Sequence, residues 1–217
     1  MDPRDALSEG VVGVSHEITP ELLFEAYSFG IFPWPHQESE PTLWFCPPRR
    51  GVLVFSDLHL PRSLIKYRRK STWNFTLNQR FPEVMAACAN AIRPEQKGTW
   101  ITDQMIRAYL NFHQQGYAHS IECWSEGSLI GGMYGTYVAG VFSGESMFYR
   151  EKNASKLCLL YLIEGLAQNG ISWIDIQMLT PHLEALGAKT ISRSSYLKWL
   201  DQAKAKASPL AFFGQKN

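Results

Sequence analysis

The sequence predicts an α+β protein in which a small N-terminal domain, residues 1–49, precedes a larger domain, residues 50–217. Residues 1–49 are rich in proline, glycine and aromatic side chains, and so short a segment buries little surface by itself. We therefore expect it to pack on the remainder. From residue 50 onward, strand and helix signals alternate, which predicts a mixed, mostly antiparallel sheet with helices on its faces.

One short helix is expected in the N-terminal domain. Thr19 is a suitable N-cap, Pro20 fits the first turn, and Gly30 is expected to end the helix. Two segments that follow, IFPWP and LWFCPPRR, are expected to be extended pieces interrupted by proline.

The larger domain is expected to contain a meander of antiparallel strands. Turn signals at Glu126 with Gly127 and at Ala139 with Gly140 predict two hairpins in succession. The strands are expected at residues 52–55, 73–77, 118–124, 127–138, 141–148 and 173–177. The helices are expected at residues 61–69, 81–90, 103–115, 154–169, 181–186 and 193–205.

The composition argues against several classes of protein. No run of about 18 apolar residues occurs, so no membrane span is expected. The first residues, MDPRDALSEG, are polar and acidic, unlike a signal peptide. The four cysteines are widely spaced without a Cys-x-x-Cys pair, and no His-x-x-x-His pair occurs. We therefore expect reduced thiols, a cytoplasmic location and no metal.

One basic stretch, PRSLIKYRRKS, stands out against the net charge of +1. It contains Arg62, Lys66, Arg68, Arg69 and Lys70 without one acidic residue. On a helix these side chains form a positive stripe that suits a phosphate backbone. A plain solvated helix face is the alternative, and the cluster alone does not identify a ligand.

The order of elements resembles the acetyltransferase-like fold of the GCN5-related superfamily. That superfamily carries a glycine-containing turn after its fourth strand, where helix N-terminal amides bind a pyrophosphate. The corresponding stretch here, YREKNASKLC, contains no glycine. Coenzyme A is therefore not expected as the donor, and the turn instead offers Asn153, Ser155 and Lys156.

Eight short motifs occur in order along nearly the whole chain: GIFPWP, GTWIT, GYAHSIECW, GGMYG, GESMF, NASK, DIQ and HLEALGA. Together they resemble the leucyl/phenylalanyl-tRNA–protein transferase family. The resemblance implies transfer of Leu or Phe, and also Met, from aminoacyl-tRNA to the N-terminal α-amine of proteins that begin with Lys or Arg. The product is marked for degradation. The activated ester supplies the driving force, so no cofactor is implied.

The resemblance assigns catalysis to Glu145, Asp175 and Gln177. Glu145 of GESMF is expected to hold the α-amino group of the donor, and an ion pair with Arg150 or Lys156 is the alternative. Asp175 and Gln177 alternate with apolar residues and so point to one face of a strand. The resemblance implies that Gln177, oriented by Asp175, contacts the attacking amine. Gln177 either relays a proton or only positions the amine, and a buried structural pair is a third reading.

The donor side chain needs an apolar pocket. Leu159, Leu162 and Leu166 recur at helical spacing, a pattern that is more often plain core. The resemblance implies that they form the wall of the Leu/Phe pocket, with Met133 of GGMYG nearby and Ser155 also in the substrate site.

The 3′ adenosine needs a surface on which to stack. Trp34 and Trp100 match the adenine-contacting tryptophans of the family, although each is also a reasonable packing residue. With the resemblance, the basic stretch from Arg62 to Lys70 is expected to bind the acceptor-stem phosphates.

Two positions depart from the pattern of the family. Thr180 stands where some relatives have Asn, and WFCP replaces a more usual double-Trp stretch. Two other functions remain open on sequence alone: a non-catalytic module that binds tRNA ends or peptides, and an acyl-CoA N-acetyltransferase. The retained Glu145, Asp175 and Gln177 argue against the first, and the glycine-free turn argues against the second.

Overall fold

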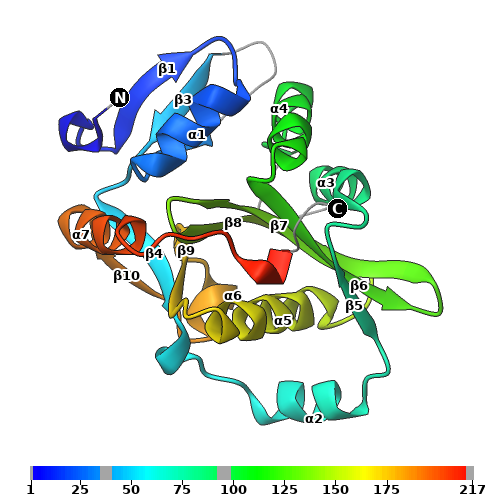
Figure 1. Cartoon of the computed structure of the whole chain (residues 1–217). Helices are drawn as coiled ribbons and strands as arrows, with labels where there is room; N and C mark the ends of the chain where they lie inside the picture. Colours follow the sequence, from blue (N-terminus) through cyan, green and yellow to red (C-terminus); the bar gives the residue numbers. More distant parts are fainter. Residues whose placement is uncertain (1, 35–40, 92–98, 214–217) are drawn as a thin grey trace.

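The computed structural model describes residues 2–34, 41–91 and 99–213, which form two sheets (Figure 1). The smaller sheet is antiparallel and has the strand order β1-β3-β2. Its strands are β1 (Val11–Ser15), β2 (Phe32–Trp34) and β3 (Thr42–Phe45). The helix α1 (Pro20–Ser28) runs beside this sheet, between β1 and β2 in the chain.

The ends of α1 follow from the residues expected to form them. The Thr19 hydroxyl accepts a hydrogen bond from the backbone N–H of Leu22 at 3.2 Å. Gly30 follows the helix with a φ of +73°, a left-handed conformation that favours glycine. A Cβ at Gly30 would lie 2.5 Å from the ring of Tyr196, so glycine is also required by the packing.

The larger sheet has seven strands in the order β10-β4-β9-β8-β7-β6-β5. Every neighbouring pair is antiparallel except β8 and β9, which run parallel. The strands are β4 (Arg49–Val54), β5 (Asn74–Leu77), β6 (Ala118–Ser125), β7 (Ser128–Val138), β8 (Val141–Tyr149), β9 (Trp173–Gln177) and β10 (Lys189–Ser192). The predicted mixed, mostly antiparallel sheet is confirmed.

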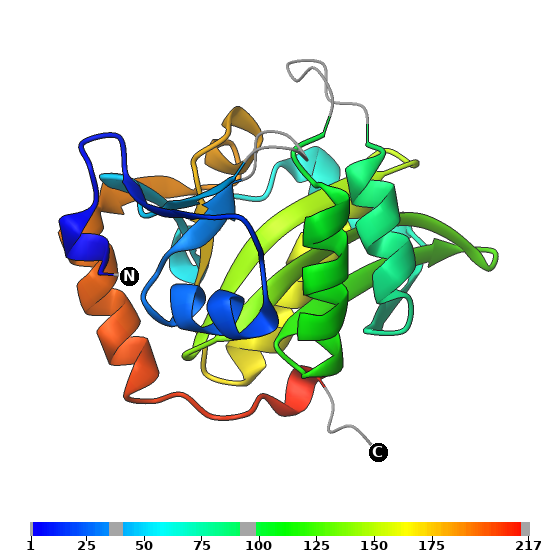
Figure 2. The same ribbon diagram turned by 90° about the horizontal axis from the view of Figure 1, so that it is seen from above.

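Helices cover both faces of the larger sheet. In Figure 1, α3 (Phe81–Ala89) and α4 (Asp103–Gln114) lie above it, and α5 (Ala154–Gln168) lies below. The view from above in Figure 2 shows α1 beside α4, which brings the smaller sheet against the larger domain. The remaining elements are α2 (Arg62–Lys70), α6 (Pro181–Glu184), α7 (Arg193–Lys204) and short 3-10 helices at Pro3–Asp5, Phe55–Asp57 and Ala211–Phe213.

Two large apolar cores result from this layering, and a smaller one lies around Tyr196 and Leu200 of α7. One core joins α1, α3 and α4 to the upper face of the sheet and includes Tyr27, Phe112 and Tyr134. The other lies between the lower face and α5 and includes Leu159 and Leu162. None of the helices within the described ranges is long and apolar enough to cross a membrane.

The structure differs from the sequence-based expectation at three short strands. β1 and β10 were not expected, and β4 begins at Arg49 where a strand was expected only from residue 52. β4 therefore crosses the predicted domain boundary after residue 49, and that boundary stays a prediction. Both hairpin turns are confirmed, since Glu126, Gly127, Ala139 and Gly140 all have positive φ angles.

Candidate functional site

Glu145 occupies an irregularity in β8 where the strand pairing shifts by one residue. Tyr134 of β7 lies opposite Ser146, and Gly135 lies opposite Gly144. Glu145 is therefore the extra residue of a β-bulge, a feature that redirects a side chain within a strand. The bulge explains how a carboxylate leaves the regular alternation of β8.

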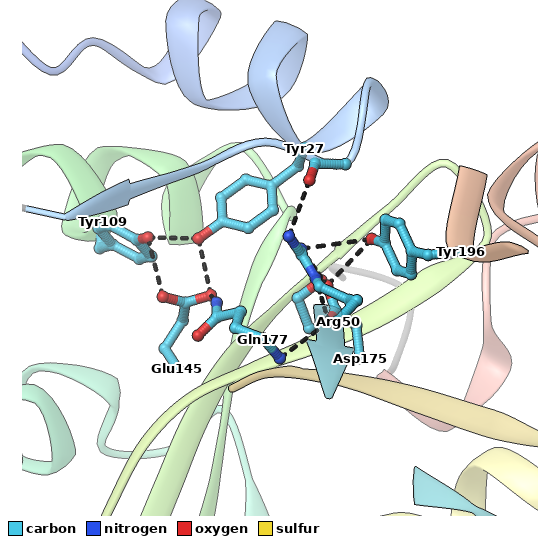
Figure 3. A network of polar contacts seen from close by, with 9 residues as sticks. Tyr27, Arg50, Tyr109, Glu145, Asp175, Gln177 and Tyr196 are labelled. Atoms are coloured by element: carbon cyan, nitrogen blue, oxygen red, sulfur yellow. Dashed lines mark hydrogen bonds and ion pairs between the residues drawn. The ribbon is translucent and has the colours of Figure 1, made fainter. Parts of the chain in front are cut away.

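The Glu145 carboxylate receives hydrogen bonds from three different elements (Figure 3). The Tyr27 hydroxyl of α1 donates to Oε1 at 2.7 Å, and the Gln177 amide of β9 donates to the same oxygen at 2.6 Å. The Tyr109 hydroxyl of α4 donates to Oε2 at 3.2 Å. The two phenol oxygens are themselves 2.5 Å apart. The carboxylate thus joins the small N-terminal sheet unit to the larger domain.

Burial raises the pKa of Glu145 to about 7. The negative charge of Asp175 raises it further, whereas the hydrogen bonds from Tyr27, Tyr109 and Gln177 oppose the shift. Within the described ranges no cationic side chain pairs with Glu145. Arg150, an expected alternative partner, instead donates to the carbonyl of Leu129 at 2.8 Å. Glu145 is thus a nearly buried carboxyl group that changes its charge near neutral pH.

Asp175 has the opposite surroundings, because it is held by a cation. Arg50 donates from Nε to Oδ1 at 2.8 Å and from Nη2 to Oδ2 at 2.6 Å, and both side chains are almost fully buried. The hydroxyls of Ser143 and Tyr196 donate to Oδ2 at 3.1 and 3.0 Å. Arg50 also donates to the carbonyl of Gly30 at 2.9 Å. The bidentate pair and the two hydroxyl hydrogen bonds together link β4, β8, β9 and α7 at the Asp175 carboxylate.

Gln177 ends β9 in a left-handed conformation, with a φ of +59°. Such a conformation is uncommon for a residue with a side chain and often marks a functional position. Its backbone N–H donates to Oδ1 of Asp175 at 2.9 Å, while its side-chain amide reaches Glu145. Asp175 therefore orients Gln177 through the main chain.

A cavity of about 300 Å³ opens beside Glu145 and Gln177. Its walls are mostly apolar, and Glu145 is the carboxylate that faces it. Trp34 and Trp100 stack in its wall with ring centroids 6.2 Å apart and planes 22° apart. The lining residues are Phe32, Pro33, Trp34, Trp100, Met133, Gly144, Glu145, Ser146, Met147, Leu159, Ile174, Ile176, Gln177, Met178, Thr180, His182 and Leu183.

Six of the residues expected from the sequence come together at this cavity. Those residues are Trp34, Trp100, Met133, Glu145, Leu159 and Gln177. Pro35 of the IFPWP motif and Gly98 of GTWIT lie outside the described residues.

Asp175, Ser155, Leu162 and Leu166 do not line the cavity. Leu166 lies seven residues beyond Leu159, about 10 Å further along the helix axis, so the expected stripe leaves the cavity and continues into the lower core. Ser155 is buried in the first turn of α5, against β7. Asp175 lies behind Gln177 in the pair with Arg50.

The basic stretch forms α2, which lies on the α5 side of the sheet. Arg68 makes two hydrogen bonds of 2.6 Å to Glu164 of α5, and both side chains remain about half exposed. Lys66 and Lys70 border a second, shallow cavity of about 450 Å³ beside Trp73. Among the five predicted basic residues, Arg68 is thus the one with a carboxylate partner in the described structure.

Tyr27, Tyr109, Arg50 and Tyr196 surround the two carboxylates, but sequence reasoning missed them. A buried tyrosine normally finds a partner for its hydroxyl, and this rule is the signal that was available. Tyr27 is almost fully buried and Tyr109 is fully buried, and burial raises the pKa of both phenols well above the ordinary value.

The described residues contain no group of three or more His, Cys, Asp or Glu side chains arranged to hold a metal ion. The four cysteines are free thiols, and all four are buried. The polar side chains that line the cavity are those of Glu145, Gln177, His182, Ser146 and Thr180, beside the two stacked indoles.

Comparison with known proteins identifies the family. The family model described as leucyl/phenylalanyl-tRNA protein transferase matches residues 52–201, and the model of its N-terminal domain matches residues 16–48. A leucyl/phenylalanyl-tRNA–protein transferase of Shewanella sp. (strain W3-18-1) is 44% identical over 206 residues, which cover 94% of this chain and 86% of that protein. One from Oleidesulfovibrio alaskensis is 44% identical over 207 residues and covers 93% and 83%.

Similar solved structures include a GCN5-related N-acetyltransferase-like protein from Streptococcus suis. Its TM-score is 0.38 at 16% identity, with 79% of this chain and 64% of that chain covered. L-PGS from Bacillus licheniformis has a TM-score of 0.38 at 13% identity, with 71% and 51% covered. These values describe a loose likeness of fold and nothing about activity.

Proposed function

This chain belongs to the leucyl/phenylalanyl-tRNA protein transferase family, and we propose that it transfers leucine or phenylalanine from an aminoacyl-tRNA to the N-terminal α-amine of a protein. The observation that supports this proposal best is a carboxyl group beside a mostly apolar cavity that has no cationic partner among the described residues. That group, Glu145, suits the amino group of an aminoacyl-adenosine, and the stacked Trp34 and Trp100 suit its adenine.

The α-amino group of the donor is proposed to bind at Glu145. An ammonium group placed there gains a charge-assisted hydrogen bond in a mostly apolar site, where such a bond is strong. A donor whose amine carries an acyl group loses the positive charge and at least one N–H. The carboxylate therefore selects an amino acid with a free amine.

The donor side chain is proposed to lie between Met133, Met147, Leu159, Ile174 and Ile176. These residues offer apolar walls, and the two methionines adapt their shape to either a branched or an aromatic donor. A cavity of about 300 Å³ lies at the lower end of the range of small-molecule sites, which suits one amino acid and its ester bond. Met is proposed as a third donor, because its unbranched apolar side chain suits the same adaptable apolar walls.

In the proposed reaction, the acceptor amine attacks the ester carbonyl carbon. The new C–N bond forms as the bond from carbon to the ribose oxygen breaks, and the proton lost by the amine ends on that oxygen. Gln177 lies beside Glu145 and is proposed to orient the amine, since an amide is a poor base at neutral pH. The proton then passes directly or through the ribose hydroxyl, and positioning supplies about 7–11 kcal/mol of barrier lowering.

The acceptor protein is proposed to approach over Met178, Thr180 and His182, which follow Gln177 on the rim of the cavity. Acceptors beginning with Lys or Arg are the expected class. The acceptor stem of the tRNA is proposed to contact the basic helix α2 through Arg62, Lys66, Arg69 and Lys70. The reaction is proposed to take place in the cytoplasm, where aminoacyl-tRNA is made.

The experiment is to incubate the chain with casein and either labelled Leu-tRNA or labelled acetyl-CoA. The proposal expects label in casein from Leu-tRNA only. Label from acetyl-CoA would support an acyl-CoA acetyltransferase instead. Tight binding of Leu-tRNA without transfer would support a non-catalytic tRNA-end binding module.

A further inference from the structure

The imidazole of His182 lines the cavity and makes no hydrogen bond, ion pair or ring contact within the described residues. Two other histidines are held by such contacts. The ring of His113 stacks on Phe81, and the ring of His119 stacks on Phe213. Packing explains those two rings, whereas His182 is a partly buried ring whose nitrogens have no protein partner in the described structure.

The chain that follows β9 is fixed in place before it reaches His182. It first passes over Gly51 of β4, where a Cβ would lie 2.9 Å from the carbonyl carbon of Met178. Thr180 then begins α6 and caps it, because its hydroxyl accepts a hydrogen bond from the backbone N–H of Leu183 at 3.3 Å. The backbone therefore holds His182 on the cavity rim, over which the acceptor protein is proposed to approach.

The surroundings of His182 favour the neutral form of its ring. Burial lowers the pKa of His182 below the ordinary value of 6.5, and the positive charge of Lys156 on α5 lowers it further. Glu145 of β8 lines the same cavity, but it is proposed to bind the donor amine. The other charged groups near α6 are those of Glu184, which is exposed, and of Asp57, which is paired with Lys189. A neutral imidazole carries a lone pair on one ring nitrogen, which can accept a proton.

We propose that His182 is the general base of the transfer, and that it carries the proton of the acceptor amine to the ribose oxygen. As the amine nitrogen bonds to the ester carbonyl carbon, its N–H bond breaks and the proton moves to the free ring nitrogen. The imidazolium then gives this proton to the ribose oxygen as the bond from carbon to that oxygen breaks. The ring returns to its neutral form, and no other reactant is needed.

This inference rests on the proposed function and defines the proton path that the function leaves open. The three polar groups then have separate tasks: Glu145 binds the donor amine, Gln177 orients the acceptor amine, and His182 takes its proton. A weak base is sufficient here, because an amine nitrogen that has begun to bond to carbon is a much stronger acid than a free ammonium group. A base that is neutral near pH 7 is also ready to act at that pH.

The first test compares His182→Asn with the parent and with His59→Asn. His59 is an exposed histidine whose backbone N–H donates to the carbonyl of Leu186, just after α6, so it controls for the loss of an imidazole in this region. A placed base contributes about 10²–10⁴-fold, so kcat/KM for the acceptor should fall by about 100-fold or more in His182→Asn and keep the parent value in His59→Asn. The Kd of Leu-tRNA and the urea denaturation midpoint should stay at the parent values in both variants.

The second test supplies the base from solution. His182→Ala leaves space at the cavity rim, and added imidazole should raise its kcat/KM in proportion to the concentration of the neutral form. N-methylimidazole has a basic nitrogen but no N–H, so it should restore transfer as well as imidazole does. Neither compound should raise the activity of the parent or of His59→Asn.

A kcat/KM near the parent value in His182→Asn would overturn the proposal. So would a loss in His182→Ala that neither imidazole compound reverses while Leu-tRNA still binds with the parent Kd. Failure of the proposed function is seen separately, in the parent protein: binding of Leu-tRNA without transfer of leucine to casein would reject that function before any variant is compared.

Discussion

Asp175 and Glu145 are carboxylates on neighbouring strands, both nearly or fully buried, yet their partners differ in charge. Asp175 meets the guanidinium of Arg50 in a bidentate pair and has no exposed surface. Glu145 meets two phenols and an amide, none of which carries a charge, and faces a cavity. One carboxylate is neutralised by the protein itself, and the other remains available to a cationic ligand.

We propose that Asp175 supports the site, whereas Glu145 binds the substrate. The pair of Asp175 with Arg50 ties together β4, β9 and the carbonyl of Gly30 after α1, and holds the backbone of Gln177. Among the described residues no cation offsets the charge of Glu145, so burial raises the pKa of its carboxyl group. A raised pKa beside a cavity is a property of functional sites, whereas a paired buried ion is most often structural.

The largest expected effect is on stability, at Arg50. Arg50→Met leaves Asp175 buried without a counter-ion, and we expect a loss of about 3–5 kcal/mol in the free energy of unfolding. Urea denaturation measures this loss. The double variant Arg50→Met with Asp175→Leu removes both charges and should recover most of it. If the single variant loses less than about 1 kcal/mol, the pair does not anchor this region.

The second prediction concerns the pH dependence of stability at Glu145. Its pKa is about 7 in the folded protein against an ordinary value of 4.5, so the folded state binds one more proton than the unfolded chain between these values. The contribution of this group to the free energy of unfolding is therefore fully present below pH 4.5. About 3 kcal/mol of it is lost as the pH rises to 7.

Urea denaturation at several pH values in this range should show that the free energy of unfolding depends less on pH in Glu145→Gln than in the parent. Glu83→Gln, which changes a half-exposed carboxylate on α3, is the control and should keep the parent curve. Parallel curves for the parent and Glu145→Gln would contradict the raised pKa.

The third prediction compares two buried leucines of α5. Leu159 lines the cavity and Leu162 does not, although both are almost fully buried. Each change to Ala should cost about 2–5 kcal/mol of stability. Only Leu159→Ala should change the ratio of kcat/KM for Leu-tRNA over Phe-tRNA, by roughly tenfold towards Phe, because only there does the donor gain space. If the ratio changed in Leu162→Ala and not in Leu159→Ala, the donor pocket would be formed by Leu162 and not by Leu159.

The smallest expected effect is in the salt dependence of tRNA binding. Arg69→Ala should flatten the slope of log K against log[salt] by about 0.7–0.9 if that side chain contacts a phosphate. Arg68→Ala should change the slope less, because Glu164 already compensates its charge. Equal changes for the two variants would show that Arg68 leaves Glu164 to bind the RNA.

Much of the fold was predictable because local signals and packing agree. Thr19, Pro20 and Gly30 mark the helix α1, and the two turns with positive φ mark the meander. β10 was missed because a four-residue strand between two helices has too few residues to show a period. Its pairing with β4 comes from tertiary structure.

The site was predicted less completely, for a physical reason. Glu145 and Gln177 are polar residues in apolar strands, so the sequence marks them. Tyr27 and Tyr109 lie on apolar helix faces where aromatic residues are ordinary core. Only the long-range contact between α1, α4 and β8 turns their hydroxyls into partners of Glu145. The bulge that directs Glu145 depends on strand register, which the sequence does not state.

The most direct test asks whether Glu145 meets the α-amine of the donor. Leu-tRNA is compared with tRNA carrying the 2-hydroxy analogue of leucine, in the parent and in Glu145→Gln. Because a hydrogen bond to a charged group contributes about 1.5–3 kcal/mol, the parent should prefer the amine donor by about 10- to 100-fold in kcat/KM. In Glu145→Gln this preference should fall close to one, with little change in tRNA affinity. The account is contradicted if the variant slows both donors by the same factor and the preference stays at the parent value.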